Sequence, residues 1–383
     1  MIDLSIGEEY EALRKTVEEF AREEVAPVIG GFYEREEFPY DLIAKMGRMG
    51  LFGLPISEEY GGMGGDYFAL CLALEELARV DSSVAITLEA GVSLGAMPVY
   101  RFGSASQKET WLPALCRGDR LAAFGLTEPG GGSDAGATKT TARLEGDAWV
   151  INGSKSFITN SGTDITSMVT VTAVTGQAEG GRKEISAIIV PSGTPGFGVE
   201  KKYSKVGWNA SDTHGLSFSD CRVPEGNLLG ERGRGYAQFL SILDEGRVAI
   251  AALSVGLAQG CVDESLRYAH EREAFGHNIG HYQAIQFKIA EMETRTHTAR
   301  LSYYAAAAKM LRGEPFKKEA AIAKLVCSEA AMDNARDATQ IFGGYGFMNE
   351  YPVGRFYRDA KILEIGEGTS EVQKMLIARH LGL

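Results

Sequence analysis

A short segment near the end of the chain carries a carboxylate suited to proton transfer. Residues 365–371 read Ile-Gly-Glu-Gly-Thr-Ser-Glu, with Glu367 between two glycines. Glycines permit a sharp turn and close approach of a ligand to the backbone, and the helical pattern over 371–380 supplies an N-terminus that could hold an anion. This pattern predicts a catalytic base. It is equally typical of an ordinary capped helix with a solvated glutamate.

A glycine-rich segment could grip a polar ligand. Residues 124–134 read Phe-Gly-Leu-Thr-Glu-Pro-Gly-Gly-Gly-Ser-Asp. Successive glycines expose backbone N–H groups, and Thr127 and Ser133 add hydroxyls, so the segment could bind the edge of a heterocycle or a phosphate. The alternative is a linker between domains.

A third segment could stack a flat ligand. In Lys-Ser-Phe-Ile-Thr-Asn, residues 155–160, Phe157 and Thr159 are two residues apart and would project from one face of a strand. The alternative is an inward phenylalanine in the core.

Two further segments place a polar side chain beside an aromatic residue and glycines at a helix end. They are Arg-Glu-Ala-Phe-Gly at 272–276, with Gln283 beyond it, and Gln-Ile-Phe-Gly-Gly-Tyr-Gly at 340–346. Helix C-caps explain the glycines equally well. The Arg272 guanidinium could fork onto a pyrophosphate, or it could simply be solvated.

Helices and strands must position these segments, and they occur in separate blocks. Apolar residues at three- and four-residue spacing predict helices over 8–28, 40–49, 68–80, 107–116, 236–272, 283–311 and 317–341. Short β-rich runs lie between them, at 148–152, 168–172, 185–190 and 214–218. This arrangement predicts an α+β fold. No G-x-G-x-x-G joins a strand to a helix, so a Rossmann nicotinamide site is unsupported.

Composition limits the class of protein. A chain of 383 residues is long enough for two or three packed units. The net charge of −12 disfavours binding to nucleic acid or to an anionic membrane. Five scattered cysteines without a C-x-x-C pair predict reduced thiols, and we expect a cytoplasmic protein because no signal sequence opens the chain. No apolar run reaches the ~18 residues of a membrane span.

A metal site is not expected. His277 and His281 are four residues apart, but Gly280 interrupts any helix and no pair of carboxylates accompanies them.

Taken together, the segments resemble the acyl-CoA dehydrogenase family. Their order is T-E-P-G-x-G-S-D, K-x-F-I-T-N, D-E-G-R, R-x-x-F-G, Q-I-F-G-G-x-G, R-D-A-K and E-G-T-S-E, and it runs essentially end to end. Each motif is weak alone, whereas the whole series in this order is specific.

The resemblance implies an N-terminal α-helical domain over 1–122, a middle β domain over 123–232 and a C-terminal four-helix-type α domain over 233–383. It implies FAD as the cofactor, in a cleft that also touches a neighbouring subunit of a homotetramer. It also implies an acyl-CoA substrate and an electron-transferring flavoprotein as the electron acceptor.

The resemblance also assigns site residues. Those on the flavin-ring side of the cleft are Phe124, Leu126, Thr127, Gly132, Ser133, Phe157 and Thr159. Those that reach the FAD of the adjacent subunit are Arg272, Phe275, Gln283, Gln340, Ile341, Phe342, Gly343 and Gly344, while Thr369, Ser370 and Glu371 contact the nucleotide part. Those expected near the substrate are Ser133, Asp244, Arg247, Gly366 and Gly368.

The reaction implied is α,β-dehydrogenation of the acyl thioester. Glu367 takes the α-proton, the β-hydrogen leaves as hydride to the flavin, and the backbone N–H of Glu367 helps to stabilise the enolate oxygen. A dry pocket should raise the pKa of Glu367 towards neutrality.

Two positions distinguish this chain within the family. Some relatives carry the catalytic base just before the arginine of D-E-G-R. This chain has Gly246 at that position, so no side chain there could act as the base in place of Glu367. Arg247 is expected to help anchor the CoA end. These features favour the short-chain branch, but Gly366 stands where many relatives have tyrosine, so chain length and branching stay open.

Two other functions remain possible on this sequence. One is an acyl-CoA oxidase or flavin-dependent monooxygenase on the same scaffold, in which oxygen meets the reduced flavin. The other is a flavin-free helical binding protein.

Overall fold

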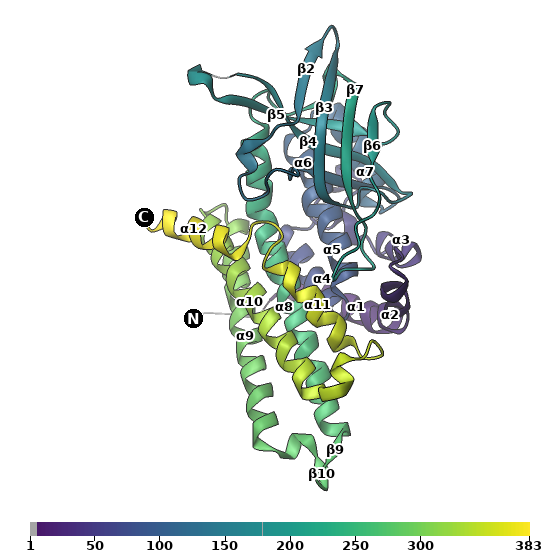
Figure 1. Ribbon diagram of the computed structural model, residues 1–383, viewed down its shortest axis with the longest axis vertical. Helices are drawn as coiled ribbons and strands as arrows, with labels where there is room; N and C mark the ends of the chain where they lie inside the picture. The colour runs from purple at the N-terminus through teal and green to yellow at the C-terminus, as the bar shows by residue number, and fades with distance from the viewer. Residues whose placement is uncertain (1–5, 178) are drawn as a thin grey trace.

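The computed structural model describes residues 6–177 and 179–383. Helices of the first third of the chain pack between a β domain at one end and long C-terminal helices at the other (Figure 1). The predicted α+β fold, with helical blocks on either side of a β block, is confirmed.

The N-terminal block is helical throughout. Its α-helices are α1 (Glu8–Phe20), α2 (Ala26–Arg35), α3 (Tyr40–Arg48), α4 (Tyr67–Ala78), α5 (Ser82–Glu89), α6 (Met97–Phe102) and α7 (Ala105–Cys116). Asp66 and Asp81 cap α4 and α5, each accepting a hydrogen bond from a backbone N–H of the first turn. The sequence did not predict α5 and α6, because nearly every residue of this stretch is buried and no amphipathic period remains.

Helices α5 and α6 form one continuous helical stretch through the π-helical turns Ala90–Ala96. This stretch, Ser82–Phe102, is long and apolar enough to cross a membrane by length and composition, so the expectation that no segment reaches that length was wrong. Because 94% of its most apolar window is buried inside the fold, it has the character of a core helix.

The middle block is a mixed sheet. Its strands are β1 (Leu121–Gly125), β2 (Thr141–Glu145), β3 (Ala148–Thr159), β4 (Thr166–Gln177), β5 (Lys183–Pro191), β6 (Phe197–Val199), β7 (Thr213–Pro224) and β8 (Leu228–Leu229). The order is β6-β7-β3-β2-β4-β5-β8, with β1 parallel to β4. Inward side chains such as Trp149, Ile188 and Phe218 form a core of their own between its strands.

The C-terminal block consists of long helices. They are α8 (Gly235–Glu271), α9 (Gln283–Leu311), α10 (Lys317–Phe342), α11 (Pro352–Leu363) and α12 (Ser370–His380). The hairpin of β9 (Glu273–Ala274) and β10 (His277–Asn278) lies at the far end of α8 and α9, away from the β domain (Figure 1).

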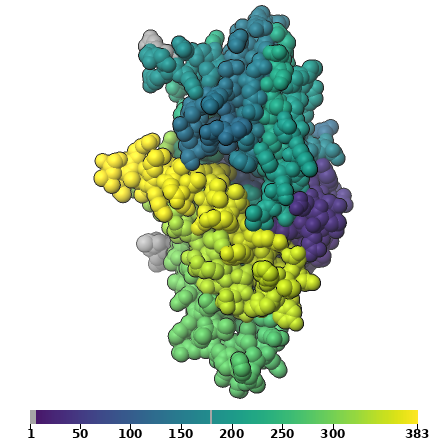
Figure 2. Space-filling view, in the orientation of Figure 1, coloured from purple at the N-terminus to yellow at the C-terminus, as the bar shows by residue number. Residues whose placement is uncertain are grey.

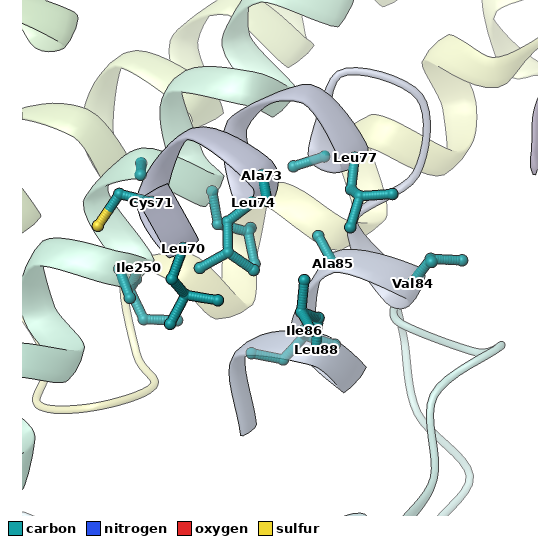
Figure 3. Close-up of a cluster of buried hydrophobic side chains, with 14 of the residues drawn as sticks. Leu70, Cys71, Ala73, Leu74, Leu77, Val84, Ala85, Ile86, Leu88 and Ile250 are labelled. Carbon is teal, nitrogen blue, oxygen red and sulfur yellow. The ribbon is translucent and has the colours of Figure 1, made fainter. Parts of the chain in front are cut away.

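The large core joins the N-terminal and C-terminal helices. Leu70 and Leu74 of α4, Ile86 and Leu88 of α5, and Ile250 of α8 belong to one buried cluster (Figure 3). Small residues over 254–260 allow α8 to approach α4 closely, because a Cβ at Gly256 or Gly260 would overlap backbone carbonyl oxygens of α4 and of Arg79 just beyond it.

A buried carboxylate ties the three blocks together. Asp359 of α11 accepts hydrogen bonds from Tyr33 Oη at 2.6 Å, Ser82 Oγ at 2.8 Å and the backbone N–H of Trp208 at 2.7 Å. Arg355, one turn earlier, donates to Asp81 at 2.8 Å. The aspartate of the R-D-A-K motif is therefore a structural acceptor.

Candidate active site

Glu367 occupies a strained turn between α11 and α12. Its φ is +52°, a left-handed conformation that favours glycine, and Gly368 follows with φ +95°. Gly366 does not share this conformation, and a Cβ there would meet only Ile362 O, at 3.4 Å. The sharp turn predicted from the two glycines therefore rests on Gly368 and on Glu367 itself.

Two buried side chains donate hydrogen bonds to carbonyl oxygens of this turn. Lys324 Nζ of α10 donates to Gly368 O at 2.8 Å, and Gln373 Nε2 of α12 donates to the same oxygen at 2.8 Å and to Glu367 O at 3.3 Å. The sequence analysis missed both residues. A signal exists for Lys324, which is a lone charge among buried small residues of α10.

The helix after the turn begins as predicted. Thr369 is the N-cap of α12, and its Oγ1 accepts from Val372 N at 3.3 Å. Ser370 Oγ is buried without a hydrogen-bond partner in the described residues, whereas the side chain of Glu371 is exposed.

The Glu367 carboxyl group is buried, which excludes the solvated-glutamate alternative. Neither oxygen has a hydrogen-bond partner among the described residues. The group lies against Gly246 of α8, where a Cβ would overlap Oε2 and stand 3.2 Å from the carboxyl carbon. Burial raises the pKa of Glu367 to about 7, while the neighbouring carboxyl group of Glu89 and the Arg247 and Lys324 charges lower it. The absence of a side chain at Gly246 therefore provides the room that this carboxyl group occupies.

Asp244 and Arg247 lie in the same neighbourhood on α8. Both are buried, and Arg247 Nη1 donates to Asp244, which also pairs with Lys317 Nζ at 2.9 Å. Arg247 Nε has no partner in the described part of the chain. A guanidinium N–H is thus free to bind a ligand oxygen.

A second buried glutamate, which the sequence analysis missed, lies beside Glu367. Glu89, the last residue of α5, is completely buried, and neither carboxyl oxygen has a partner among the described residues. Burial and the adjacent Glu367 raise the pKa of Glu89 well above its usual range. The signal that could have found it is that Glu89 is the only charged residue over 82–100.

The glycine-rich segment and the Phe157 segment lie side by side in the β domain. Ser156 N donates to Thr127 O at 2.8 Å, and the buried Lys155 Nζ donates to Glu128 Oε1 at 2.8 Å. Glu128 also accepts from the backbone N–H groups of Lys139 and Thr140. These contacts fix the segment as a structured loop, so it is more than a linker.

Phe157 is not a core residue. Its side chain is 66% exposed and its φ is +61°, at an irregularity where β3 pairs with β7 between Lys155 and Ile158. Thr159 is partly buried, and Gly132 and Ser133 are exposed. By contrast, Phe124 and Leu126 are buried, and Phe124 stacks on Phe239 of α8 with ring centroids 4.0 Å apart.

The segments at 272–283 and 340–346 meet at the far end of the long helices. The Arg272 guanidinium lies 5.8 Å from the centroid of the Tyr345 ring. Phe275 is 96% exposed at the tip of the β9–β10 hairpin with φ +52°. Gln283 and Gln340 are also exposed.

The side chains of Ile341 and Phe342 are buried, and Phe342 stacks on Tyr268 at 4.0 Å. A ligand at Ile341, Phe342, Gly343 or Gly344 could therefore contact the backbone but no side chain of these residues. This end of the helices is distant from the Glu367 turn, so one copy of the chain does not bring the two groups of residues together (Figure 1).

The histidines of the hairpin region stack on each other. The rings of His277 and His281 have centroids 4.2 Å apart. Over residues 6–177 and 179–383, no group of three or more histidine, cysteine, aspartate or glutamate residues could hold a metal ion.

The segment that carries Glu367 packs against the β domain on one face of the molecule (Figure 2). The turn thus brings together a buried carboxyl group with a pKa near neutrality and a guanidinium with a free N–H. This arrangement is suited to removing a proton from a weak carbon acid.

Comparison with known proteins identifies matches along the whole chain. The description "Acyl-CoA dehydrogenase, N-terminal domain" matches residues 7–119, the middle domain of the same name matches 123–221 and the C-terminal domain matches 233–382. The "Probable acyl-CoA dehydrogenase YngJ" of Bacillus subtilis is 48% identical over 99% of this chain and 100% of its own.

Solved structures agree. Butyryl-CoA dehydrogenase from Megasphaera elsdenii superposes with a TM-score of 0.96 at 41% identity, over 100% of both chains. A chain from a structure described as "Electron transferring flavoprotein of Acidaminococcus fermentans" gives a TM-score of 0.95 at 42% identity, over 99% of both chains.

Proposed function

The chain belongs to the acyl-CoA dehydrogenase family, and from this premise we propose that it catalyses FAD-dependent α,β-dehydrogenation of a short-chain acyl-CoA to the trans-2-enoyl-CoA, with Glu367 as the base. The observation that carries the proposal is the buried, unpartnered Glu367 carboxyl group beside Gly246. The short acyl chain is supported by the similarity to butyryl-CoA dehydrogenase.

The residues present fit FAD. The exposed Phe157 ring offers an apolar face for the flavin, and hydroxyls are available from Thr159 in the same strand and from Thr127, whose carbonyl oxygen accepts from Ser156 N. Ser370 Oγ, buried without a partner among the described residues, suits a polar group of the nucleotide. When bound, FAD supplies the acceptor for the β-hydrogen.

Glu367 would serve the reaction in two ways. Its carboxylate removes the α-proton, and its backbone N–H forms no hydrogen bond with the described residues, so it is free to donate to the thioester oxygen. Lys324 and Gln373 hold the carbonyl groups of the turn and thereby orient that N–H.

The remaining substrate contacts come from both domains. The free Arg247 N–H, with Asp244 fixing the guanidinium, suits an oxygen of the CoA portion. Ser133 is exposed on the β domain, and Gly366 and Gly368 leave open backbone beside the base.

The proposal includes partners. The exposed Phe275 and the exposed Gln283 and Gln340 support contact with the FAD of a second subunit, as in a homotetramer. An electron-transferring flavoprotein is supported as acceptor by the similarity to the Acidaminococcus structure. The cytoplasmic location and the domain limits 1–122, 123–232 and 233–383 remain predictions.

The proposal is tested by mixing FAD-loaded protein anaerobically with saturated acyl-CoAs of increasing chain length. We expect the flavin absorbance near 450 nm to bleach fastest with a short chain. Rapid reoxidation by air would favour the oxidase alternative. Protein that takes up no FAD on reconstitution would contradict the proposal and support a binding protein.

The pH dependence of kcat/KM should report the base. Because only the ionised carboxylate accepts the α-proton and the pKa of Glu367 is about 7, kcat/KM should fall about tenfold for each pH unit below 7. The titratable and charged groups that face it are Glu89, Arg247 and Lys324. Steady-state rates with an artificial dye acceptor measure the profile, and a profile that is flat from pH 5.5 to 8 would contradict the assignment.

A further inference from the structure

Glu89 has no role in the reaction described above, yet its environment is unusual. It is completely buried at the end of α5, and neither of its oxygens has a hydrogen-bond partner among the described residues. Buried carboxyl groups in native proteins are nearly always paired, so an unpaired one indicates a missing partner. No lysine or arginine among the described residues forms an ion pair with it.

Two groups near Glu89 carry a proton, the hydroxyl of Ser93 and the carboxyl group of Glu367, but neither is in hydrogen-bonding geometry with it in the described residues. Ser93, one turn further along, accepts a hydrogen bond from Tyr67 Oη at 2.8 Å and keeps its own hydroxyl proton. The other neighbour is the carboxyl group of Glu367, which is itself without a partner among the described residues. When both are ionised they repel each other, so in the free protein one of the two is expected to be protonated.

The position of Glu89 relative to Glu367 suggests the missing partner. Glu367 must touch the α-carbon of the acyl group, and part of its turn reaches the surface, whereas Glu89 lies entirely inside the protein. An acyl chain that enters past Glu367 would therefore direct its distal carbons at Glu89. A plain alkyl chain would cover both Glu89 oxygens without satisfying either of them.

We propose, on the basis of the function above, that Glu89 determines specificity by binding a hydrogen-bond donor, a hydroxyl or ammonium group, carried beyond the β-carbon of a short acyl-CoA. Such a group would donate a hydrogen bond to a Glu89 carboxyl oxygen at the closed end of the acyl site. Sites built to hydrogen-bond a substrate hydroxyl or amine discriminate strongly against the analogue that lacks it.

The first test measures binding without turnover. S-Butyl-CoA and S-(4-hydroxybutyl)-CoA are thioethers without an acidic α-proton and differ by one hydroxyl group. Isothermal titration calorimetry of the FAD-loaded protein should give a Kd at least about tenfold lower for the hydroxylated ligand. Equal affinities would overturn the proposal.

Variants at Glu89 make the test specific. Glu89→Leu should reverse the preference in favour of S-butyl-CoA, and the nearly isosteric Glu89→Gln should keep a weaker preference for the hydroxyl while losing any preference for S-(4-aminobutyl)-CoA. Thermal unfolding and FAD content show whether each variant is folded. A hydroxyl preference that persists in folded Glu89→Leu would overturn the proposal.

The outcome separates this inference from the proposed function. Protein that is bleached by butyryl-CoA but does not distinguish the two thioethers retains the function and loses the role of Glu89. Protein that distinguishes the thioethers but is bleached neither by butyryl-CoA nor by 4-hydroxybutyryl-CoA retains the binding role and loses the dehydrogenase proposal.

Discussion

Replacing Glu367 with glutamine should lower kcat with a short-chain acyl-CoA by about 10³- to 10⁴-fold. Glutamine has nearly the same size and keeps the turn, but it cannot accept the α-proton. The variant should still bind FAD and acyl-CoA, because its backbone N–H and the contacts from Lys324 and Gln373 do not depend on the carboxylate. Stopped-flow reduction under anaerobic conditions measures the effect directly.

The stability of the Glu367→Gln variant should be unchanged or higher. The introduced amide can donate to Glu89, so the substitution removes an unfavourable pair of buried carboxyl groups. Glu364→Gln is the matched control, because Glu364 lies three residues before Glu367 and its carboxylate is paired with Lys361 at 2.6 Å. Normal flavin reduction in Glu367→Gln would show that another group takes the proton.

Replacing Gly246 with alanine should lower kcat/KM by about 10- to 100-fold while leaving the protein folded. The added Cβ would occupy the space of Glu367 Oε2 and push the carboxyl group away from the position proposed for proton transfer. Alanine is a better helix former than glycine by about 0.5–1 kcal/mol, so α8 itself should not be weakened. Activity and thermal unfolding, measured together, separate the two effects.

A double variant provides the control for Gly246→Ala. Aspartate is one methylene shorter than glutamate, so Glu367→Asp should be less harmful in the Gly246→Ala background than in the native chain. The coupling between the two substitutions measures their contact. Full activity in Gly246→Ala, or additive effects in the double variant, would mean that Glu367 does not use this space during catalysis.

The sequence predicted the long helices well because their amphipathic period is strong. The helix predicted over 283–311 has those bounds in the structure, and the one predicted over 317–341 ends one residue later. Helices α5 and α6 escaped prediction for the opposite reason: they are buried on all sides, so apolar residues occur without a period. Boundaries in the β domain were too short wherever polar residues continue a strand, as in β3.

The candidate site was predictable only in part. Glu367 and its neighbours form a contiguous motif, and their role was predicted from the resemblance to a family. Glu89, Lys324 and Gln373 are single polar residues in helices, and their burial depends on contacts between segments far apart in the chain. The strain at Glu367 was also invisible, because the glycine before it suggested that the glycines alone took the unusual conformation.

The carboxylate of Asp359 has a consequence for how this protein can be divided. It accepts from Tyr33, Ser82 and Trp208, and Arg355 beside it binds Asp81, so residues from all three blocks share one buried polar cluster. A fragment ending near residue 122 would lose both Arg355, which donates to Asp81, and Asp359, which accepts from Tyr33. The three blocks are therefore not interchangeable modules, and a chimaera of two relatives would have to take all residues of this cluster from the same parent. For the same reason, the chain should unfold in a single cooperative transition.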